Sequence, residues 1–329
     1  MRNLSADLKS ILLSAFVSIC LFFISGCLPD APPETTREGS ISDNAVKVTP
    51  QTDMYPPVLH ASDWFDPIPM PGPVNTPGVE DAPVVTSDGD TFIFFFTSDG
   101  NVPAEKQILD GVTGVWWCGR NGADWTEPVR AHLGDPDTLH LDGPFAVQDT
   151  TLWFGSIREG NYRDIDIYTA ELLEGEWINR QNAGEQINME FNAGELYPTA
   201  DGNFLYFGRA EGALGQNDLW LTTRRGKAWS EPVNLGTPVN TAGDESRPFI
   251  SSDGSELWFT RMHSGRGYTG PAVFRSIKTG DIWSEPEEIV SNYAGDPGLD
   301  DQGNLYFTHL FYDAEGRKIE ADIYVAYHR

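Results

Sequence analysis

Acidic side chains recur along the sequence about every fifty residues, and a basic side chain follows most of them after about fifteen more. The acidic set is Asp81, Asp142, Glu195, Glu245 and Asp296, and the basic set is Arg158, Arg209, Arg261 and His309. Carboxylates that alternate with guanidinium groups can hydrogen-bond a sugar or a peptide, or hold a cation. The same side chains can instead pair with one another and fix the geometry of a repeat. The spacing alone leaves a ligand site and an internal ion-pair network both open.

A repeated unit positions these side chains. The two clearest copies run from Glu195 to Thr241 and from Glu245 to Glu287, a third begins at Asp81, and weaker copies begin at Asp142 and Asp296. Each copy contains short apolar or alternating runs separated by Asp-Gly, Gly-rich or Pro-containing turns, which predicts one four-stranded antiparallel sheet. One such sheet cannot bury both faces, whereas sheets packed radially cover one another.

The sequence therefore predicts an all-β fold, a five-bladed β-propeller of four-stranded antiparallel blades over residues 63–329. The repeated tryptophans agree with five blades: Trp64, Trp125, Trp177, Trp229 and Trp283. The last copy stops before its fourth strand, and residues 63–76 match residues 229–241. We expect this N-terminal segment to supply the outermost strand of the last blade and to close the ring. First strands then begin, and second strands end, at one mouth of the axial channel, where the acidic and basic sets should meet.

Several motifs of the repeat resemble those of a known family. They are Pro-x-x-x-Ser-Asp-Gly, Leu-Trp/Tyr-Phe, Asp-Ile-Tyr and Trp-Ser-Glu-Pro-Val-Asn-Leu-Gly. Together they resemble the WD-repeat-like β-propeller repeats of TolB-type periplasmic proteins and of envelope proteins fused to peptidoglycan-binding domains. The resemblance implies a binding scaffold at the cell envelope without a universal catalytic motif. It does not extend to a TolB-like N-terminal domain or a peptidoglycan-binding domain, so no Tol partner is implied.

The first residues have the pattern of an export signal. Arg2 and Lys9 precede an apolar stretch that is too short to span a membrane, and the stretch ends in Ile24-Ser25-Gly26-Cys27. This ending resembles the lipobox of bacterial lipoproteins, which implies a signal peptide over residues 1–26 and a lipid anchor on Cys27. Leu28 implies an outer-membrane location in a Gram-negative host. Residues 27–62 are rich in Pro, Thr, Asp and Glu, which predicts a disordered tether.

Charge and cysteine content exclude other classes of partner. The chain has 49 acidic and 22 basic side chains and a formal net charge of −27, so nucleic acid is not expected as a partner. Only Cys118 remains after Cys20 leaves with the signal and Cys27 takes lipid, and the six histidines are scattered. No cofactor and no zinc-type metal site is predicted, and Cys118 is predicted to be a buried, inert thiol. A calcium ion in the central channel is left open by the acidic set.

Three functions are compatible with this pattern. The preferred one is an envelope-anchored lipoprotein whose propeller is a non-catalytic binding module for a glycan, a peptide or a protein partner. The alternative is a glycoside hydrolase, because propellers of the arabinanase and fructosidase type place two Asp and one Glu in the funnel. That resemblance would make Asp81, Asp142 and Glu195 base, modulator and acid. Catalysis is the second choice because acids in every copy are what a structural repeat produces. A ligand-free scaffold for envelope assembly is the third.

Overall fold

The computed structural model describes residues 36–329, apart from residues 123, 136–137 and 266–267. Helical structure in this part is limited to α1 (Arg37–Ser40), α2 (Ala104–Gln107) and a π-helical turn at Gln186–Glu190. The remaining regular structure consists of strands, which pair almost entirely as antiparallel neighbours. The prediction of an all-β fold is confirmed. No helix in the described part of the chain is both long and apolar enough to cross a membrane.

Three of the sheets each follow one copy of the repeat. The first contains, in order, β8 (His140–Gln148), β9 (Thr151–Arg158), β10 (Asp166–Leu173) and β11 (Glu176–Asn182). The second contains β12 (Leu196–Pro198), β13 (Phe204–Arg209), β14 (Asp218–Arg225), β15 (Ala228–Trp229) and β16 (Val233–Asn234). The third contains β17 (Glu245–Ile250), β18 (Glu256–Gly265), β19 (Tyr268–Thr279), β20 (Ile282–Trp283) and β21 (Glu287–Ser291), with β1 (Val58–Leu59) added beside β21.

The fourth sheet has nine strands and contains both ends of the repeat region. One half contains β22 (Ala294–Leu299), β23 (Leu305–Tyr312), β24 (Lys318–Ala326) and β2 (Ile68–Pro69), which pairs with β24. The other half contains β3 (Val79–Val85), β4 (Thr91–Thr97), β5 (Gly114–Asn121), β6 (Asp124–Trp125) and β7 (Val129–Arg130). The halves are joined by one parallel pair of residues, Ala321 and Val79.

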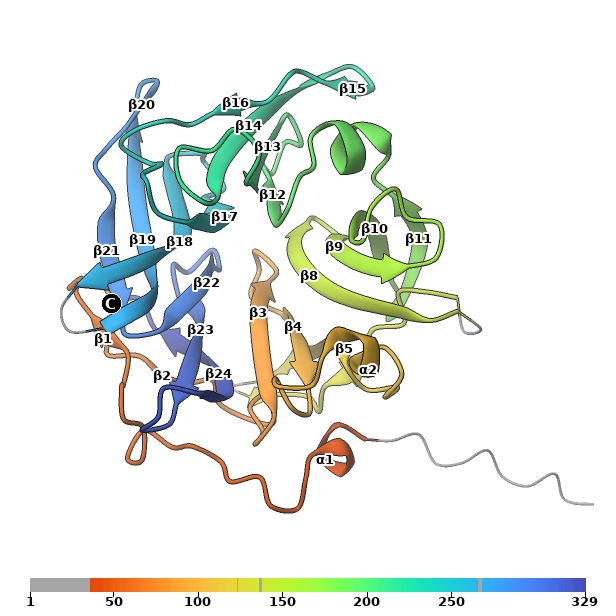
Figure 1. The fold of residues 1–329 in the computed structure, drawn as a ribbon, viewed down its shortest axis with the longest axis vertical. Coiled ribbons are helices and arrows are strands. Elements are labelled where there is room, and N and C mark those ends of the chain that lie inside the picture. Colours follow the sequence, from red (N-terminus) through yellow and green to blue (C-terminus); the bar gives the residue numbers. More distant parts are fainter. Residues whose placement is uncertain (1–35, 123, 136–137, 266–267) are drawn as a thin grey trace, which may run out of the picture. The chain divides into compact units, whose positions relative to one another are not determined.

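The first strands of the repeats surround a common axis. β3 contacts β8, β8 contacts β12, β12 contacts β17, β17 contacts β22, and β22 contacts β3. Figure 1, which looks along the shortest axis of the structure, shows these five strands around the centre and the later strands of each repeat further out. This radial arrangement of antiparallel sheets is that of a β-propeller.

Residues 63–76 occupy the same place in the last repeat as residues 229–241 do in theirs. β2 pairs with β24, with Ile68 opposite Val325. Asn75 accepts a hydrogen bond from the Ile323 amide (3.0 Å) and donates to the Ile323 carbonyl (2.9 Å). Asn240 clips Leu219 in the same way, at 2.9 Å for both bonds. The matching motif Val-Asn-Thr therefore performs the same local task at both places.

Aromatic side chains fill the spaces between neighbouring sheets. Trp64, Trp125, Trp177 and Trp283 are between 3% and 9% exposed, as expected of residues that pack between repeats. Cys118 is 1% exposed within the cluster that contains Phe92 and Trp125. Burial raises the pKa of its thiol to about 12, which makes it inert at neutral pH.

The segment before the repeats differs from the expectation. A disordered tether was predicted for residues 27–62, but residues 36–62 are ordered and lie against the sheets. Arg37 is 2% exposed, and β1 adds a strand to the sheet of β21. The physical reason is that charged side chains in this segment find buried partners, so its polar composition does not signal disorder. The predicted signal peptide, Cys27 and Leu28 lie outside the described residues.

Candidate functional site

The neck of the axial channel contains one arginine between carboxyl groups. Arg247 lies in β17, and its Nε is 3.1 Å from Oε1 of Glu195 and 3.1 Å from Oδ1 of Asp296. Glu195 precedes β12, and Asp296 lies in β22. Asp81 in β3 is hydrogen-bonded to Asp296 and also accepts a bond from Thr308 Oγ1 at 3.0 Å. Three of the predicted acids, Asp81, Glu195 and Asp296, therefore meet around a guanidinium group that was not predicted.

β-Bulges bring these side chains to the neck. The pairing of β3, β17 and β22 with the next strand is interrupted at Asp81/Val84, Ser246/Phe249 and Gly295/Gly298. In each bulge the first of the two unpaired residues has a positive φ, namely 51° for Ala82, 52° for Arg247 and 54° for Asp296, and the second is a proline. A bulge redirects the side chains of its strand, here toward the channel. The sequence signal for Arg247 was its place directly before Pro248, equivalent to Asp296 before Pro297.

The two neighbouring carboxyl groups differ in proton affinity. Burial raises the pKa of Asp296 to about 8 despite the opposing charge of Arg247, and the negative charge of Asp81 raises it further. For Asp81, burial acts upward as well, but the hydrogen bond from Asp296 and the charge of Arg247 outweigh it and lower its pKa. At neutral pH Asp296 therefore holds the proton of the pair and Asp81 is ionised.

The other predicted side chains are paired within their own repeats. Asp142 accepts from Arg158 Nη2 at 2.7 Å and lies 2.6 Å from His140 Nδ1. Glu245 accepts from Arg261 Nε at 2.8 Å. Arg209 lies 3.2 Å from the exposed Glu211. These pairs neutralise one another, so the predicted ring of carboxylates and guanidinium groups is an internal network at these positions.

His309 does not line an open funnel. Its ring is 0% exposed, and its Nε2 lies 3.0 Å from Oδ2 of Asp53, which comes from the segment before the repeats. This residue is therefore covered by chain that the sequence analysis placed in the tether.

The carboxyl groups of the neck are already engaged with Arg247 and with one another. Among the described residues, no group of His, Cys, Asp and Glu is arranged to hold a metal ion. Calcium takes six to eight oxygen ligands, whereas these carboxyl groups bind the Arg247 cation and Asp296 keeps a proton. The cavity beside Arg247 has a volume of about 30 Å³, which is enough for water but far below the ~300 Å³ of small-ligand pockets.

The opposite end of the channel holds a much larger cavity. Its volume is about 670 Å³, and Val85, Tyr197 and Phe249 line both this cavity and the small one. These three side chains therefore separate the wide cavity from the neck. The Tyr197 and Phe249 rings meet edge to face, with centroids 4.8 Å apart.

The wall of the wide cavity is polar and acidic. It includes Asp149, Asp253, Glu256, Asp300 and Asp301, together with several serines, and no Lys, Arg or His is among the described residues that line it. Much of this wall comes from the Asp-Gly turns between first and second strands. In one of them Asp253 accepts bonds from Ser251 and Ser255, which holds the turn in shape. Sequence analysis assigned these turns only a structural role and missed the cavity, since it placed a ligand at the other mouth.

No protein-family model and no curated protein matches the sequence. Among solved structures, a putative TolB from Agrobacterium tumefaciens is 14% identical, with a TM-score of 0.41 over 77% of this chain and 92% of that one. A glycosyl hydrolase from Bacteroides ovatus is 10% identical, with a TM-score of 0.45 over 89% and 92%. A further glycoside hydrolase is 13% identical, with a TM-score of 0.43 over 74% of this chain and 62% of its own.

Proposed function

We propose that this chain is an envelope lipoprotein whose five-bladed propeller is a non-catalytic binding module, with its ligand in the wide cavity. The ligand classes that suit the cavity wall are glycans and peptides, which present hydroxyl, amide or amine groups to carboxylates and serines. A protein partner would be recognised through such a group on its surface.

We propose five blades because the nine-stranded sheet can be divided between β24 and β3. Only Ala321 and Val79 pair across that boundary, whereas the strands on either side pair over many residues. The first blade then contains β3, β4, β5 and β7, and the last contains β22, β23, β24 and β2. The contacts of the five first strands in ring order support the same division.

Anchoring at Cys27 is supported by the sequence pattern alone. The small residues Ser25 and Gly26 precede the cysteine, and an apolar segment of signal-peptide length precedes them. With Leu28 as the next residue, an outer-membrane location in a Gram-negative host is part of the proposal. Mass spectrometry of the membrane fraction from the native host would detect the acyl groups on Cys27, and a Cys27→Ala variant would be recovered without them.

The observation that carries the binding proposal is the size and lining of the wide cavity. Its volume of about 670 Å³ lies inside the ~300–1,000 Å³ range of small-ligand sites. Its floor contains the aromatic pair Tyr197 and Phe249, on which a sugar ring can stack. Its wall carries several acids and no lining cation, and among these acids Glu256 lies 3.8 Å from Nη1 of Arg275. The other mouth offers mainly residues that are already paired with one another.

A hydrolase is less well supported by the same geometry. Asp142 belongs to the ion pair with Arg158 and does not join Asp81 and Glu195. The Glu195 and Asp296 oxygens are each 3.1 Å from the same nitrogen, so they are separated by no more than twice that distance. This is too short for the ~6.5–9.5 Å of inverting hydrolases, and although retaining hydrolases use ~5–5.5 Å, both need the sugar between the carboxyl groups, where Arg247 lies here.

Binding is tested by blocking the cavity of the full chain. Leu299 lines the wide cavity, so Leu299→Trp should abolish the thermal stabilisation by any oligosaccharide or short peptide that binds the wild type. The matched control is Met262→Trp, because Met262 is 45% exposed near the end of β18, at the opposite mouth.

The panel consists of plant, algal and cell-wall oligosaccharides, oligolysine and calcium chloride, with product analysis of each mixture. Loss of binding in Leu299→Trp alone supports the cavity. Loss in Met262→Trp alone would move the ligand to the other mouth. Cleaved products that disappear in Asp296→Asn would replace the binding module with a hydrolase.

A further inference from the structure

We infer that residues 36–62, here called the N-terminal strap, complete the propeller by supplying its first and last blades with charged partners. The blades of β8–β11 and β17–β21 instead carry an acid–arginine pair within their own strands. The inference rests on contacts of described side chains and depends neither on a ligand nor on the lipid anchor.

The sheet of β17–β21, called the third sheet above, shows the complete arrangement. We call it the socket: a buried glutamate that is bound by a threonine four residues earlier and by an arginine on the opposite strand. Glu245 lies opposite Arg261 in the pairing of β17 and β18. Its carboxylate accepts from the Thr241 amide (3.1 Å), the Thr241 hydroxyl (2.6 Å) and Arg261 Nε (2.8 Å). The Arg261 guanidinium also donates to the Val239 carbonyl at 2.7 Å. The carboxylate is 0% exposed, and a buried charge is tolerated only where a cation and hydrogen bonds compensate it, as they do here.

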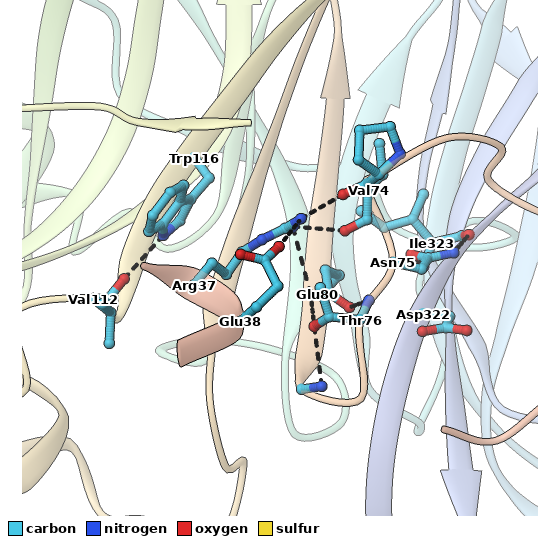
Figure 2. A network of polar contacts seen from close by, with 12 residues as sticks. Arg37, Glu38, Val74, Asn75, Thr76, Glu80, Val112, Trp116, Asp322 and Ile323 are labelled. Carbon is cyan, nitrogen blue, oxygen red and sulfur yellow. Dashed lines mark hydrogen bonds and ion pairs between the residues drawn. The ribbon is translucent and has the colours of Figure 1, made fainter. Parts of the chain in front are cut away.

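The first blade contains the same socket without its own arginine. Glu80 accepts from the Thr76 amide (2.9 Å) and the Thr76 hydroxyl (2.5 Å). The residue opposite Glu80 is Phe96, where the third sheet has Arg261. Arg37 of the strap supplies the cation: its Nη1 lies 3.7 Å from Glu80 and donates to the Val74 carbonyl at 2.6 Å, as Figure 2 shows.

Aromatic rings confirm that the two guanidinium groups occupy equivalent places. Phe259 and Phe274 are cross-strand partners, and the Arg261 guanidinium lies 5.3 Å and 4.6 Å from their centroids. Phe94 and Trp116 are the corresponding partners in the first blade. The Arg37 guanidinium lies 5.4 Å and 6.0 Å from them. The two blades thus have a guanidinium group at the same place, although Arg261 comes from a strand of the blade and Arg37 comes from the strap.

The last blade shows the converse substitution. His309 lies opposite Ala294, so this blade has a base where the third sheet has Arg261 but no acid where that sheet has Glu245. Asp53 of the strap supplies the carboxylate, with a side chain that is 2% exposed and 3.0 Å from His309 Nε2.

A third strap residue is the side-chain partner of two acids of β24. Lys47 forms ion pairs with Glu320 and Asp322, which are 2% and 1% exposed. In the second sheet the corresponding acid, Asp218, receives a hydrogen bond from Asn234, whose cross-strand partner is Trp220. In the last blade Pro69 takes that position opposite Tyr324 and has no side-chain donor. Lys47 therefore replaces a donor that β2 lacks.

All three strap contacts lie at or beside the boundary between the last and first blades, where a single parallel residue pair joins β24 to β3. Few backbone hydrogen bonds hold this boundary. Side-chain contacts that span it therefore contribute a larger share of the free energy that keeps the ring closed. The strap thus works alongside β2 to close the ring.

The test compares three methionine variants of the full chain by thermal unfolding and amide hydrogen exchange. Arg37→Met should lower Tm by several degrees, as Arg261→Met should, because each leaves a buried carboxylate without its cation. Only Arg37→Met should also raise exchange about tenfold or more in residues 36–62. Arg317→Met, which removes an arginine that is 74% exposed, should change neither.

A swap separates the strap from a general loss of packing. Adding Phe96→Arg to Arg37→Met restores the arginine position of the third sheet, and it should recover part of the lost Tm while residues 36–40 stay rapidly exchanging. The inference is overturned if Arg37→Met behaves like Arg317→Met. It is also overturned if the strap amides of the wild type exchange as fast as those of an unfolded peptide.

Discussion

At the neck of the channel, two non-glycine residues have a strained, left-handed backbone conformation. Arg247 and Asp296 have positive φ angles of 52° and 54°, which cost of order 1–3 kcal/mol for residues other than glycine. The Thr260 hydroxyl accepts from the Asp296 amide at 2.8 Å, and the Thr308 hydroxyl accepts from the Ala82 amide at 3.2 Å. Each threonine supports the bulge of the following blade, so the conformations depend on contacts between blades.

Removal of the neck cation should destabilise the protein. Arg247→Met leaves Glu195 and Asp81 facing each other without a cation, and we expect a loss of about 2 kcal/mol in the free energy of unfolding. This is below the ~3–5 kcal/mol for fully buried pairs because the Arg247 and Asp296 side chains are 26% and 18% exposed. Urea unfolding measures the change. Adding Asp81→Asn should recover part of it, and a wild-type stability in Arg247→Met would show that the cluster is not coupled.

At the scale of elements, the closing segment is held by side chains as much as by strand pairing. β2 contains only two residues, and Asn75 adds an acceptor for the Ile323 amide and a second donor to the Ile323 carbonyl, which also accepts from Met70. Asn188 and Asn240 do the same for Ile167 and Leu219. A short strand followed by one asparagine clip is thus enough to fix the outer edge of a blade.

Loss of the clip should matter more at the closing segment than elsewhere. Asn75→Ala leaves the buried Ile323 amide unpaired, while the Ile323 carbonyl keeps its bond from the Met70 amide, and the change should cost about 1–3 kcal/mol. The same change at Asn240 should cost a similar amount globally. Only Asn75→Ala should increase amide exchange in residues 63–76, because the chain does not connect that segment directly to the last blade, whereas residues 229–241 follow β14 of their own blade. Equal exchange in the two variants would contradict this role.

The sequence was sufficient for elements whose pattern repeats. Alternating runs with Asp-Gly turns located the strands, and the match of residues 63–76 to residues 229–241 located the closing segment. It was insufficient for contacts that cross between repeats. Glu80 and Arg37 are 43 positions apart and belong to no shared motif. In addition, the residues of the acidic set occupy different register positions in their strands. Glu245 lies opposite Arg261 and Asp81 opposite Phe95, whereas Asp296 lies within a bulge.

For the molecule as a whole, the formal charge of −27 disfavours each further negative charge in the folded state, so ionised carboxylates in the interior are costly. Desolvation is the main cause of the raised pKa values of Glu80 (about 7), Asp296 (about 8) and Asp322 (about 8), and it also raises the pKa of Glu320. Arg37 and Lys47 oppose the shift at Glu80, Arg247 opposes it at Asp296, and Lys47 opposes it at Asp322, where Glu320 and Glu80 add to it.

The folded protein should therefore gain stability as the pH falls from about 9 to about 6. In this window the folded state binds protons at these three acids and the unfolded state, with pKa values near 4, does not. The stability is lost as the pH rises through 7 and 8, with a slope of at most ~1.4 kcal/mol per pH unit for each group. Urea titrations at several pH values measure the slope, and Asp322→Asn should reduce it. A stability that is flat over this window would show that the three carboxylates are ionised at neutral pH.

The burial of Arg37 also limits how far the propeller can travel from its proposed anchor. Ten peptide units separate Cys27 from Arg37, and a fully extended chain of that length spans about 35 Å. With lipid on Cys27, the edge of the propeller near α1 would remain within roughly one domain diameter of the bilayer. The propeller would then search a thin layer next to the membrane, at a high local concentration toward partners in that layer, and would not reach molecules deeper in the compartment.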